Sequence, residues 1–224
     1  NALEREFAKT APSNVSRKHR TLIERSVQMM RSEHLRAFEI EAEPADVQEA
    51  YGATDFGQNC LRARRLVEAG VPFVEVISTH WDHHSGMYSQ KKGGGSGGII
   101  GKAAEVDAAM SALMDDLRSR SLLDSTLIVW LGEFGRTPKL RPLPGGGREH
   151  YSNAWTTLFA GGGIKVGQVV GRTDASGAAV EDRPVSAADF LATICLAVGI
   201  DPNKKLPAPN DRPIPIVDNQ TQTP

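Results

Sequence analysis

Cysteine is scarce in this 224-residue chain, which contains only Cys60 and Cys195. The two lie far apart, each within an apolar pattern typical of a helix, so we interpret them as small buried side chains rather than as a disulfide. Two isolated thiols say almost nothing about the redox compartment in which the protein works.

An excess of charge of one sign is also missing. Lys and Arg number 26 and Asp and Glu number 27, which gives a formal net charge of −1. No global electric field therefore draws the chain to nucleic acid or to an anionic membrane. We expect small molecules or proteins as partners, and no nucleic acid.

Long apolar runs are absent too. None approaches the roughly 18 residues that a membrane-spanning helix needs, so we expect no membrane span. The start "NALEREFAKTAPSN" lacks the charge-then-apolar layout of a signal peptide, and it does not begin with Met. An exported precursor, a processed product and an excised piece all remain compatible with such a start.

What is present suffices for a sizeable core, because 40% of the residues are hydrophobic. We expect a helical N-terminal segment over residues 1–50 and one large domain over residues 51–224. In the first segment, Ile23, Val27 and Met30 follow the i, i+4, i+7 spacing of one helix face.

Helical and strand patterns then alternate. Helices are predicted between Pro44 and Gly52, around Cys60 up to Gly70, from Ala103 onward, and after Ser186, where Asp189 suits a capping box. Strands are predicted at residues 73–77, 126–132 and 156–163, and "DRPIPIV" as a short edge strand. This order, with near-continuously apolar strands, indicates an α/β fold whose mostly parallel sheet is sandwiched by helices.

Glycine is concentrated in "KKGGGSGGIIGK", where residues 93–98 have the composition of a flexible linker. Two interpretations stay open for this segment. It is either a mobile lid or an engineered splice that replaces a natural loop.

Three histidines and an aspartate follow the first predicted strand, in "ISTHWDHHSG". In open α/β sheets ligands bind outside the carboxyl ends of the strands, so this position favours a site. Asp82 and His84 are two residues apart and would point to the same side of an extended segment, where both could reach one ion.

Glu133 follows directly after the second apolar strand. A carboxylate at that position is costly to desolvate, and a metal cation or an arginine is the usual compensation. Arg136 and Arg148 are the arginines that could pair with it. His150 follows a glycine-rich turn in "GGGREHYSN", as a ligand on a loop would.

Mixed Asp, Glu and His ligation suits zinc, manganese or iron, whereas imidazoles argue against magnesium or calcium alone. Arg136 and Arg148, one beside each ligand loop, are predicted to bind a tetrahedral oxyanion. They could instead orient the carboxylates, and the loops could be merely polar. The predicted ligands of zinc or manganese are Asp82, His84, Glu133 and His150, with His80 and His83 in reserve.

Four blocks carry a family resemblance: "FGQNCLRARRLVEAGVPFVEV", "WDHHS", "GEFGRTP" and "GGREHYSNAWTTLFAGGGIKVGQVVGRTD". They resemble the signature blocks of domain-of-unknown-function family 1501, and the resemblance runs through nearly the whole chain. That family is placed in the alkaline phosphatase-like superfamily, together with sulfatases, phosphopentomutases and nucleotide pyrophosphatases. The resemblance therefore implies an alkaline phosphatase-like core.

The resemblance also implies ligands. Superfamily members bind two metal ions with an Asp and a His after one strand, which Asp82 and His84 resemble, and with a later His that His150 resembles. Where they carry an Asp-His-Gly run, this chain reads Glu133, Phe134 and Gly135. Phe134 removes one expected ligand, so a full two-metal site would need His80 or His83 as a substitute.

The superfamily nucleophile has no counterpart here. It is a Ser, Thr or modified Cys near the N-terminus, and residues 1–50 contain no strand followed by such a residue. The family's "GGPS...D.FD" block is also missing. The resemblance implies a metal-dependent hydrolase of phosphate or sulfate esters, as a C-terminal portion without its nucleophile. The alternative is a non-catalytic metal- or anion-binding or surface-associated module. Export signals common in the family imply a periplasmic or secreted location.

Overall fold

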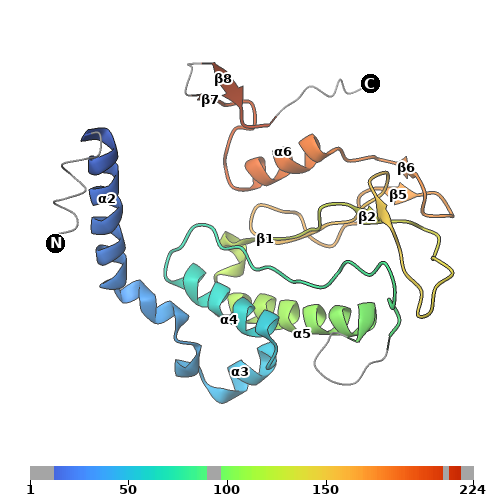
Figure 1. Ribbon diagram of the computed structural model, residues 1–224, viewed down its shortest axis with the longest axis horizontal. Coiled ribbons are helices and arrows are strands. Elements are labelled where there is room, and N and C mark those ends of the chain that lie inside the picture. Colours follow the sequence, from blue (N-terminus) through green and yellow to red (C-terminus); the bar gives the residue numbers. More distant parts are fainter. Residues whose placement is uncertain (1–12, 90–96, 209–211, 218–224) are drawn as a thin grey trace.

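The computed structural model describes residues 13–89, 97–208 and 212–217, with most helices in the first half of the chain and short strands in the second (Figure 1). The helices are α2 (Ser13–Met30), α3 (Ala45–Tyr51), α4 (Asp55–Glu68), α5 (Gly98–Ser119) and α6 (Ala187–Ala197), with the 3-10 helices η1 (Glu33–Phe38), η2 (Ile40–Ala42) and η3 (Leu123–Ser125). The strands are β1 (Leu127–Trp130), β2 (Gly135–Arg136), β3 (His150–Tyr151), β4 (Leu158–Gly161), β5 (Arg172–Thr173), β6 (Val180–Asp182), β7 (Lys205–Pro207) and β8 (Pro213–Pro215).

The core lies where α4 packs on α5, with α3 against both (Figure 1). Cys60 on α4 and Leu117 on α5 are each 1% exposed, but the helix face predicted from Ile23, Val27 and Met30 on α2 is not buried, with Val27 41% and Met30 70% exposed. Helix ends also follow the sequence signals. Gly52 and Gly70 have positive φ after α3 and α4, and α6 begins with the predicted capping box of Ser186 and Asp189.

Both cysteines are free, as predicted. Cys60 is enclosed in the core between α4 and α5, and burial, with the nearby charge of Glu105, raises the pKa of its thiol to about 12. Cys195 on α6 is partly exposed.

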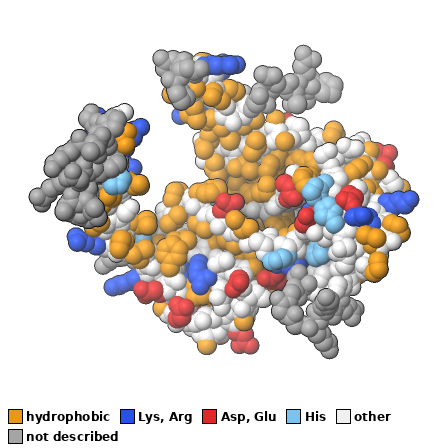
Figure 2. All heavy atoms as spheres, viewed as in Figure 1, with side chains coloured by type: hydrophobic (Ala, Val, Ile, Leu, Met, Phe, Trp, Pro, Cys, Tyr) orange, Lys and Arg blue, Asp and Glu red, His pale blue; other side chains and the backbone are white. Residues whose placement is uncertain are grey.

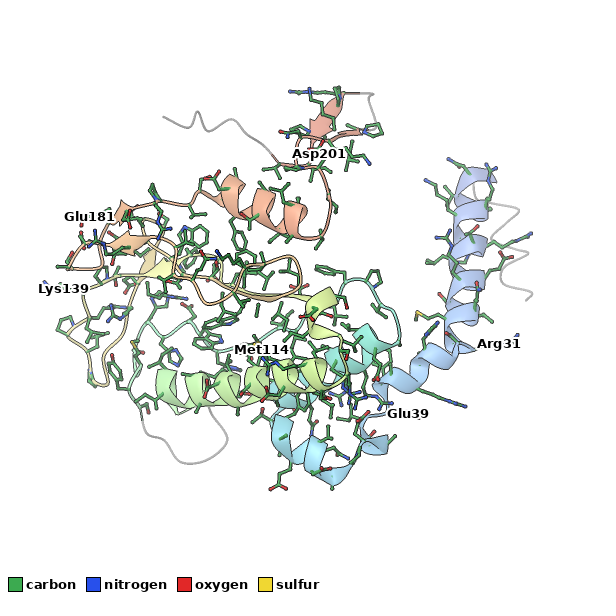
Figure 3. All side chains as sticks on the ribbon, turned by 180° about the vertical axis from the view of Figure 1, so that it is seen from behind. Arg31, Glu39, Met114, Lys139, Glu181 and Asp201 are labelled. Carbon is green, nitrogen blue, oxygen red and sulfur yellow. The ribbon has the colours of Figure 1, made fainter. Side chains whose placement is uncertain are left out.

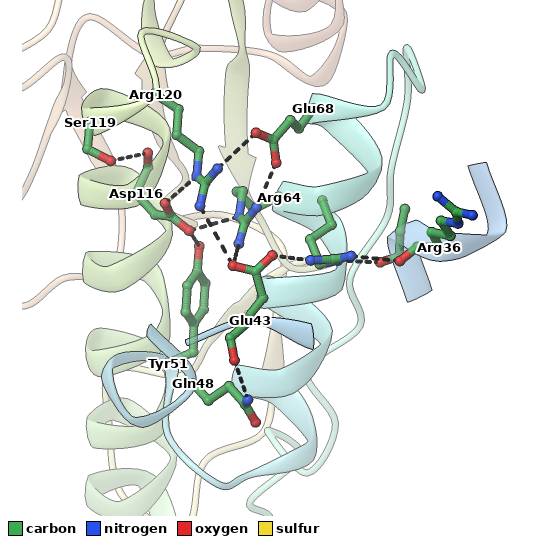
Figure 4. A network of polar contacts seen from close by, with 11 residues as sticks. Arg36, Glu43, Gln48, Tyr51, Arg64, Glu68, Asp116, Ser119 and Arg120 are labelled. Atoms are coloured by element: carbon green, nitrogen blue, oxygen red, sulfur yellow. Dashed lines mark hydrogen bonds and ion pairs between the residues drawn. The ribbon is translucent and has the colours of Figure 1, made fainter. Parts of the chain in front are cut away.

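The C-terminal ends of α4 and α5 are joined by a group of ion pairs, named here the Arg64 network (Figure 4). It consists of Glu43, Arg64, Glu68, Asp116 and Arg120. The Arg64 side chain is fully buried, and its guanidinium lies 2.6 Å from Glu43, 2.7 Å from Glu68 and 2.8 Å from Asp116. Arg120 pairs with Asp116 at 2.7 Å and with Glu68 at 2.8 Å. Every buried charge in the network is therefore paired.

Two further side chains attach the network to its surroundings. The Tyr51 hydroxyl donates to Asp116 at 3.1 Å. Arg65 pairs with Glu43 and donates to the carbonyls of Arg36 and Ala37, which ties η1 to α4. Burial acts to raise the pKa of Glu43, but hydrogen bonds and charges from Arg64 and Arg65 outweigh it and lower that pKa below its usual value.

The prediction of a mostly parallel sheet sandwiched by helices, forming an alkaline phosphatase-like core, is wrong. The strands that the structure describes pair antiparallel, in twos: β1 with β4, β2 with β3, β5 with β6 and β7 with β8. Strands were expected at 126–132, at 156–163 and in "DRPIPIV", and β1, β4 and β8 confirm them. The strand expected at 73–77 is wrong, because this segment forms no ladder.

The reason lies in the connections. A parallel pair needs a crossover on one face of the sheet, usually a helix, but the chain between β1 and β4 carries β2 and β3 and no helix, so β4 returns antiparallel. The apolar residues of segment 73–77 also led to a wrong prediction of a buried strand. Residues 73–77 leave Phe73 80% and Ile77 69% exposed, whereas a buried parallel strand would be covered on both faces.

The remaining expectations concern boundaries. The described part of residues 1–50 is helical, and α3 crosses residue 50 to pack on α4 and α5. Within the glycine-rich segment 93–98, residues 93–96 lie outside the described residues and Gly98 begins α5. In the described part of the chain, no helix has both the length and the hydropathy that crossing a bilayer requires.

Candidate metal centre

Three predicted ligands converge in the structure. Asp82, His84 and His150, named here the Asp82 cluster, bring one donor atom each to a common point. Asp82 Oδ1 lies 2.8 Å from His84 Nε2 and 3.2 Å from His150 Nε2, and the two Nε2 atoms are 3.2 Å apart. The cluster is open to solvent, since the Asp82 side chain is 60% exposed and that of His84 35% exposed. In Figure 2, histidine side chains lie beside acidic and basic ones on the face in view.

Two elements distant in sequence supply these ligands. The irregular segment after residue 80 turns tightly, with a hydrogen bond from the His84 amide to the Asp82 carbonyl, and so presents both side chains together. The β2–β3 pair supplies the third ligand. There Arg136 lies directly opposite His150, and directly opposite residues project from the same face of a ladder.

The glycine-rich turn before His150 fixes the approach of the two elements. A Cβ on Gly147 would lie 2.1 Å from the His84 carbonyl oxygen, so only glycine permits this contact. The Arg148 amide donates to the His83 carbonyl at 3.0 Å, and the Tyr88 amide donates to the Gly145 carbonyl at 2.9 Å. The "GGG" motif thus holds the loops of His84 and His150 in register.

Glu149 orients His84, a role for Glu149 that was not predicted from the sequence. Glu149 Oε2 lies 2.7 Å from His84 Nδ1, and its other oxygen pairs with Arg141 at 2.6 Å. A carboxylate at Nδ1 favours the tautomer that carries its proton there, which leaves the Nε2 lone pair directed at Asp82 and His150. The signal available in the sequence was the position of Glu149 beside His150, because ligating histidines usually have such a partner.

Arg136 and Phe134 border the cluster. Arg136 donates to Asp82 Oδ1 at 2.5 Å, and this hydrogen bond, with that from His150, holds the pKa of Asp82 below its usual value against the opposing effect of desolvation. Phe134 packs its ring 4.3 Å from that of His150. It offers no donor atom and acts instead as an apolar wall for one ligand.

The other predicted residues lie outside the cluster. Glu133 is 66% exposed, 3.8 Å from Arg136, and its role as a ligand stays a prediction. Arg148 donates to the carbonyls of Thr137 and Pro138, so its guanidinium holds the loop. The reserve ligands also point elsewhere: the rings of His80 and His83 contact Thr79 Oγ1 and the Trp81 carbonyl.

The donor triangle fits a transition metal. Tetrahedral zinc with bonds of about 2.0–2.1 Å holds its donors roughly 3.3 Å apart, and neighbouring donors around an octahedral ion lie roughly 3.0 Å apart. The edges of the triangle, 2.8, 3.2 and 3.2 Å, need to change by no more than a few tenths of an ångström. Two imidazoles and one carboxylate are also a donor set of catalytic zinc sites, which keep a further position open.

Comparison with protein families places the chain. The model of "Protein of unknown function (DUF1501)" matches residues 1–223. The chain belongs to the DUF1501 family. No curated protein and no solved structure matches it. Within this DUF1501 protein, the blocks that carried the resemblance include the two loops of the Asp82 cluster.

Proposed function

We propose that this DUF1501 protein binds a divalent transition metal, zinc or manganese, at Asp82, His84 and His150, and is a hydrolase-like protein for phosphate or sulfate esters. The observation that carries the proposal is the convergence of three donor atoms from elements more than 60 residues apart, with a carboxylate behind one imidazole. The placement in the alkaline phosphatase-like superfamily adds support by resemblance alone.

A metal ion held there would polarise an ester oxygen and lower the pKa of bound water. The protein side chains supply orientation and charge. Glu149 and Arg141 hold the His84 ring in position, and Asp82 anchors Arg136 beside the cluster. The cationic edges of Arg136 and Arg141 are the groups that would bind a tetrahedral oxyanion.

A non-catalytic metal- or anion-binding module is the second candidate, favoured by a specific observation. Among the described residues, the side-chain contacts of the Asp82 cluster are with one another, with Glu149, with Arg136 and with the Phe134 ring. No hydrogen bond joins a Ser, Thr or Cys side chain of the described chain to Asp82, His84 or His150, as one would join a nucleophile held at the cluster. Such a module would bind metal and anion without turning over esters.

Metal binding is tested by neighbouring histidines. We expect zinc or manganese at near-stoichiometric content in the purified protein by elemental analysis, and saturable binding by calorimetry after chelation. His84→Ala should abolish that binding, whereas His83→Ala should leave it unchanged, because the His83 ring contacts a backbone carbonyl. Equal metal content in wild type and His84→Ala would refute the site.

Glu133 and catalysis are separate questions. Loss of metal in Glu133→Gln would show that Glu133 joins as a fourth ligand, and unchanged content would leave a three-residue site. Hydrolysis is measured on aryl phosphates and aryl sulfates with added zinc or manganese, on this chain and on a form extended at its N-terminus. Metal binding without turnover by either form would favour the binding module.

A periplasmic or secreted location remains a prediction from the family resemblance.

A further inference from the structure

Helix α2 stands apart from the rest of the molecule. Figures 1 and 3 show it projecting at one end, joined to the body only through the turn near Arg31. It makes no extensive contact with any other described helix or strand. Most of its described side chains are exposed, with Leu22 and Met29 at 64% and Met30 at 70%, while Ser16 and Ile23 are half-buried.

The exposed helix is strongly two-sided. Because successive residues in an α-helix are rotated by about 100°, the apolar side chains fall within an arc of roughly 160°. Ser16 and Ser26 lie in the same arc. The Ser26 hydroxyl donates to the Leu22 carbonyl at 2.9 Å, whereas the Ser16 hydroxyl is buried without a hydrogen-bond partner among the described residues. The apolar residues of the arc are Val15, Leu22, Ile23, Val27, Met29 and Met30, with His19 among them.

The charges of α2 differ from those of the whole chain. The helix has four basic residues, Arg17, Lys18, Arg20 and Arg25, against one acidic residue, Glu24, a local excess of three positive charges. The complete chain has a formal net charge of −1. A neutral protein therefore carries one concentrated cationic element.

The position of each charge around the helix indicates what it would contact. At about 100° per residue, Lys18 and Arg25 lie on one border of the apolar arc and Arg20 on the other, while Glu24 and Arg17 lie on the opposite side. Long cationic side chains at both borders can extend beside an embedded apolar face and pair with phosphates at its edge. An apolar pocket of a partner protein would not require cations along both borders.

We propose that α2 docks in the plane of an anionic lipid surface, with Leu22 and Met29 on the embedded face and Lys18, Arg20 and Arg25 at the headgroups. This is independent of the proposed metal site. The charge complementarity with acidic lipid, together with the exposed Leu22, Met29 and Met30, selects this occupant over a neutral bilayer. The Asp82 cluster would thereby be held close to a membrane.

Vesicle flotation of the full 224-residue chain tests the proposal. We expect binding to vesicles of phosphatidylcholine with phosphatidylglycerol, weakening as salt is added, and little binding to phosphatidylcholine alone. Replacing both Arg20 and Arg25 by Gln should weaken binding by roughly 25-fold, from about fivefold per cation. The matched change Arg17→Gln, on the far side, should weaken it by less than about threefold because of screening.

The apolar face is tested by Leu22→Glu with Met29→Glu, which should abolish flotation. His84→Ala should float like wild type, so failure of the metal site and failure of membrane docking are distinguishable. Equal binding to neutral and anionic vesicles, or none to either, would overturn the proposal. Two other results would also overturn it. In either case Leu22→Glu would leave flotation unchanged but would remove self-association or binding to an RNA duplex.

Discussion

The Arg64 network and the Asp82 cluster are both dense groups of opposite charges, but they are built for different purposes. The first is enclosed, since the Arg64 side chain is 0% exposed and that of Glu43 8% exposed. The second lies at the surface, with the His150 side chain 52% exposed. For the chemistry of the two groups, the identity of the cationic residue, arginine or histidine, matters more than the difference in burial.

Arginine keeps its proton at any ordinary pH, so the Arg64 network is a permanent set of ion pairs that joins helices. Imidazole nitrogens can exchange a proton for a metal ion, so the histidines of the Asp82 cluster can bind either one. A buried arginine-centred cluster is therefore structural, and an exposed histidine-centred cluster is a candidate site. Four substitutions or conditions would break or sharpen this contrast.

The largest expected effect is that of Arg64→Ala. It leaves the carboxylates of Glu43 and Asp116 buried with fewer partners, and it should lower the free energy of unfolding by about 3–5 kcal/mol. Urea denaturation followed by far-UV circular dichroism measures it. Arg118→Ala is the control, because Arg118 pairs with Asp115 at the surface and should cost less than about 1 kcal/mol. Equal losses would contradict a structural role for the network.

Tyr51→Phe should have the next largest effect. It removes one hydrogen bond to the charged Asp116, which keeps its arginine partners, so we expect a loss of about 1–2 kcal/mol in the free energy of unfolding. Tyr88→Phe, at an exposed position, should change it by less than about 0.5 kcal/mol. If the two tyrosines behaved alike in urea, the hydrogen bond would contribute nothing.

Acid should weaken the helical half through Glu43. Its pKa is lower in the folded protein than the usual 4.5, so its stabilising contribution is present above pH 4.5 and is lost as pH falls from there through the folded pKa. Urea midpoints measured from about pH 6 to about pH 3 should fall in that window. Glu43→Gln should flatten part of the decline, and an identical acid profile would argue against this assignment.

The smallest effect on stability is expected at the site. Glu149→Gln should change the free energy of unfolding by less than about 0.5 kcal/mol, because the Glu149 side chain is 46% exposed. Metal affinity measured by calorimetry should nevertheless fall about 10- to 100-fold, since the carboxylate orients His84. Glu181→Gln on β6 should leave both quantities unchanged. A large loss of stability without a loss of affinity would make Glu149 a structural residue.

Local features were predictable from sequence because they depend on neighbours along the chain. The periodicity around Cys60 and Leu117, the glycines after α3 and α4 and the Ser186 cap each involve residues within one or two helical turns. Asp82 and His84 were predicted together for the same reason, since they lie two residues apart. The contact of that pair with His150 rested on the family resemblance and on an assumed sheet edge.

Strand direction and charge partners were not predictable in this way. The apolar run of β1 does not reveal that its partner β4 returns antiparallel, because direction is set by the connection. Asp116 on α5 belongs to the Arg64 network because Arg64 reaches it from α4, and spacing along α5 alone does not reveal a partner on another helix. Glu133 looked buried after a strand, but β1 ends at Trp130, before the chain reaches it.

The unequal state of the two thiols offers an experimental handle. The thiolate is the nucleophile that attacks thiol-reactive dyes, and Cys60 scarcely forms it near neutral pH because its pKa is raised to about 12 inside the core. Cys195 on α6 is partly exposed. The wild-type chain should therefore accept a single fluorescent or spin label at Cys195, which would report on folding, metal loading or vesicle binding without any engineered cysteine.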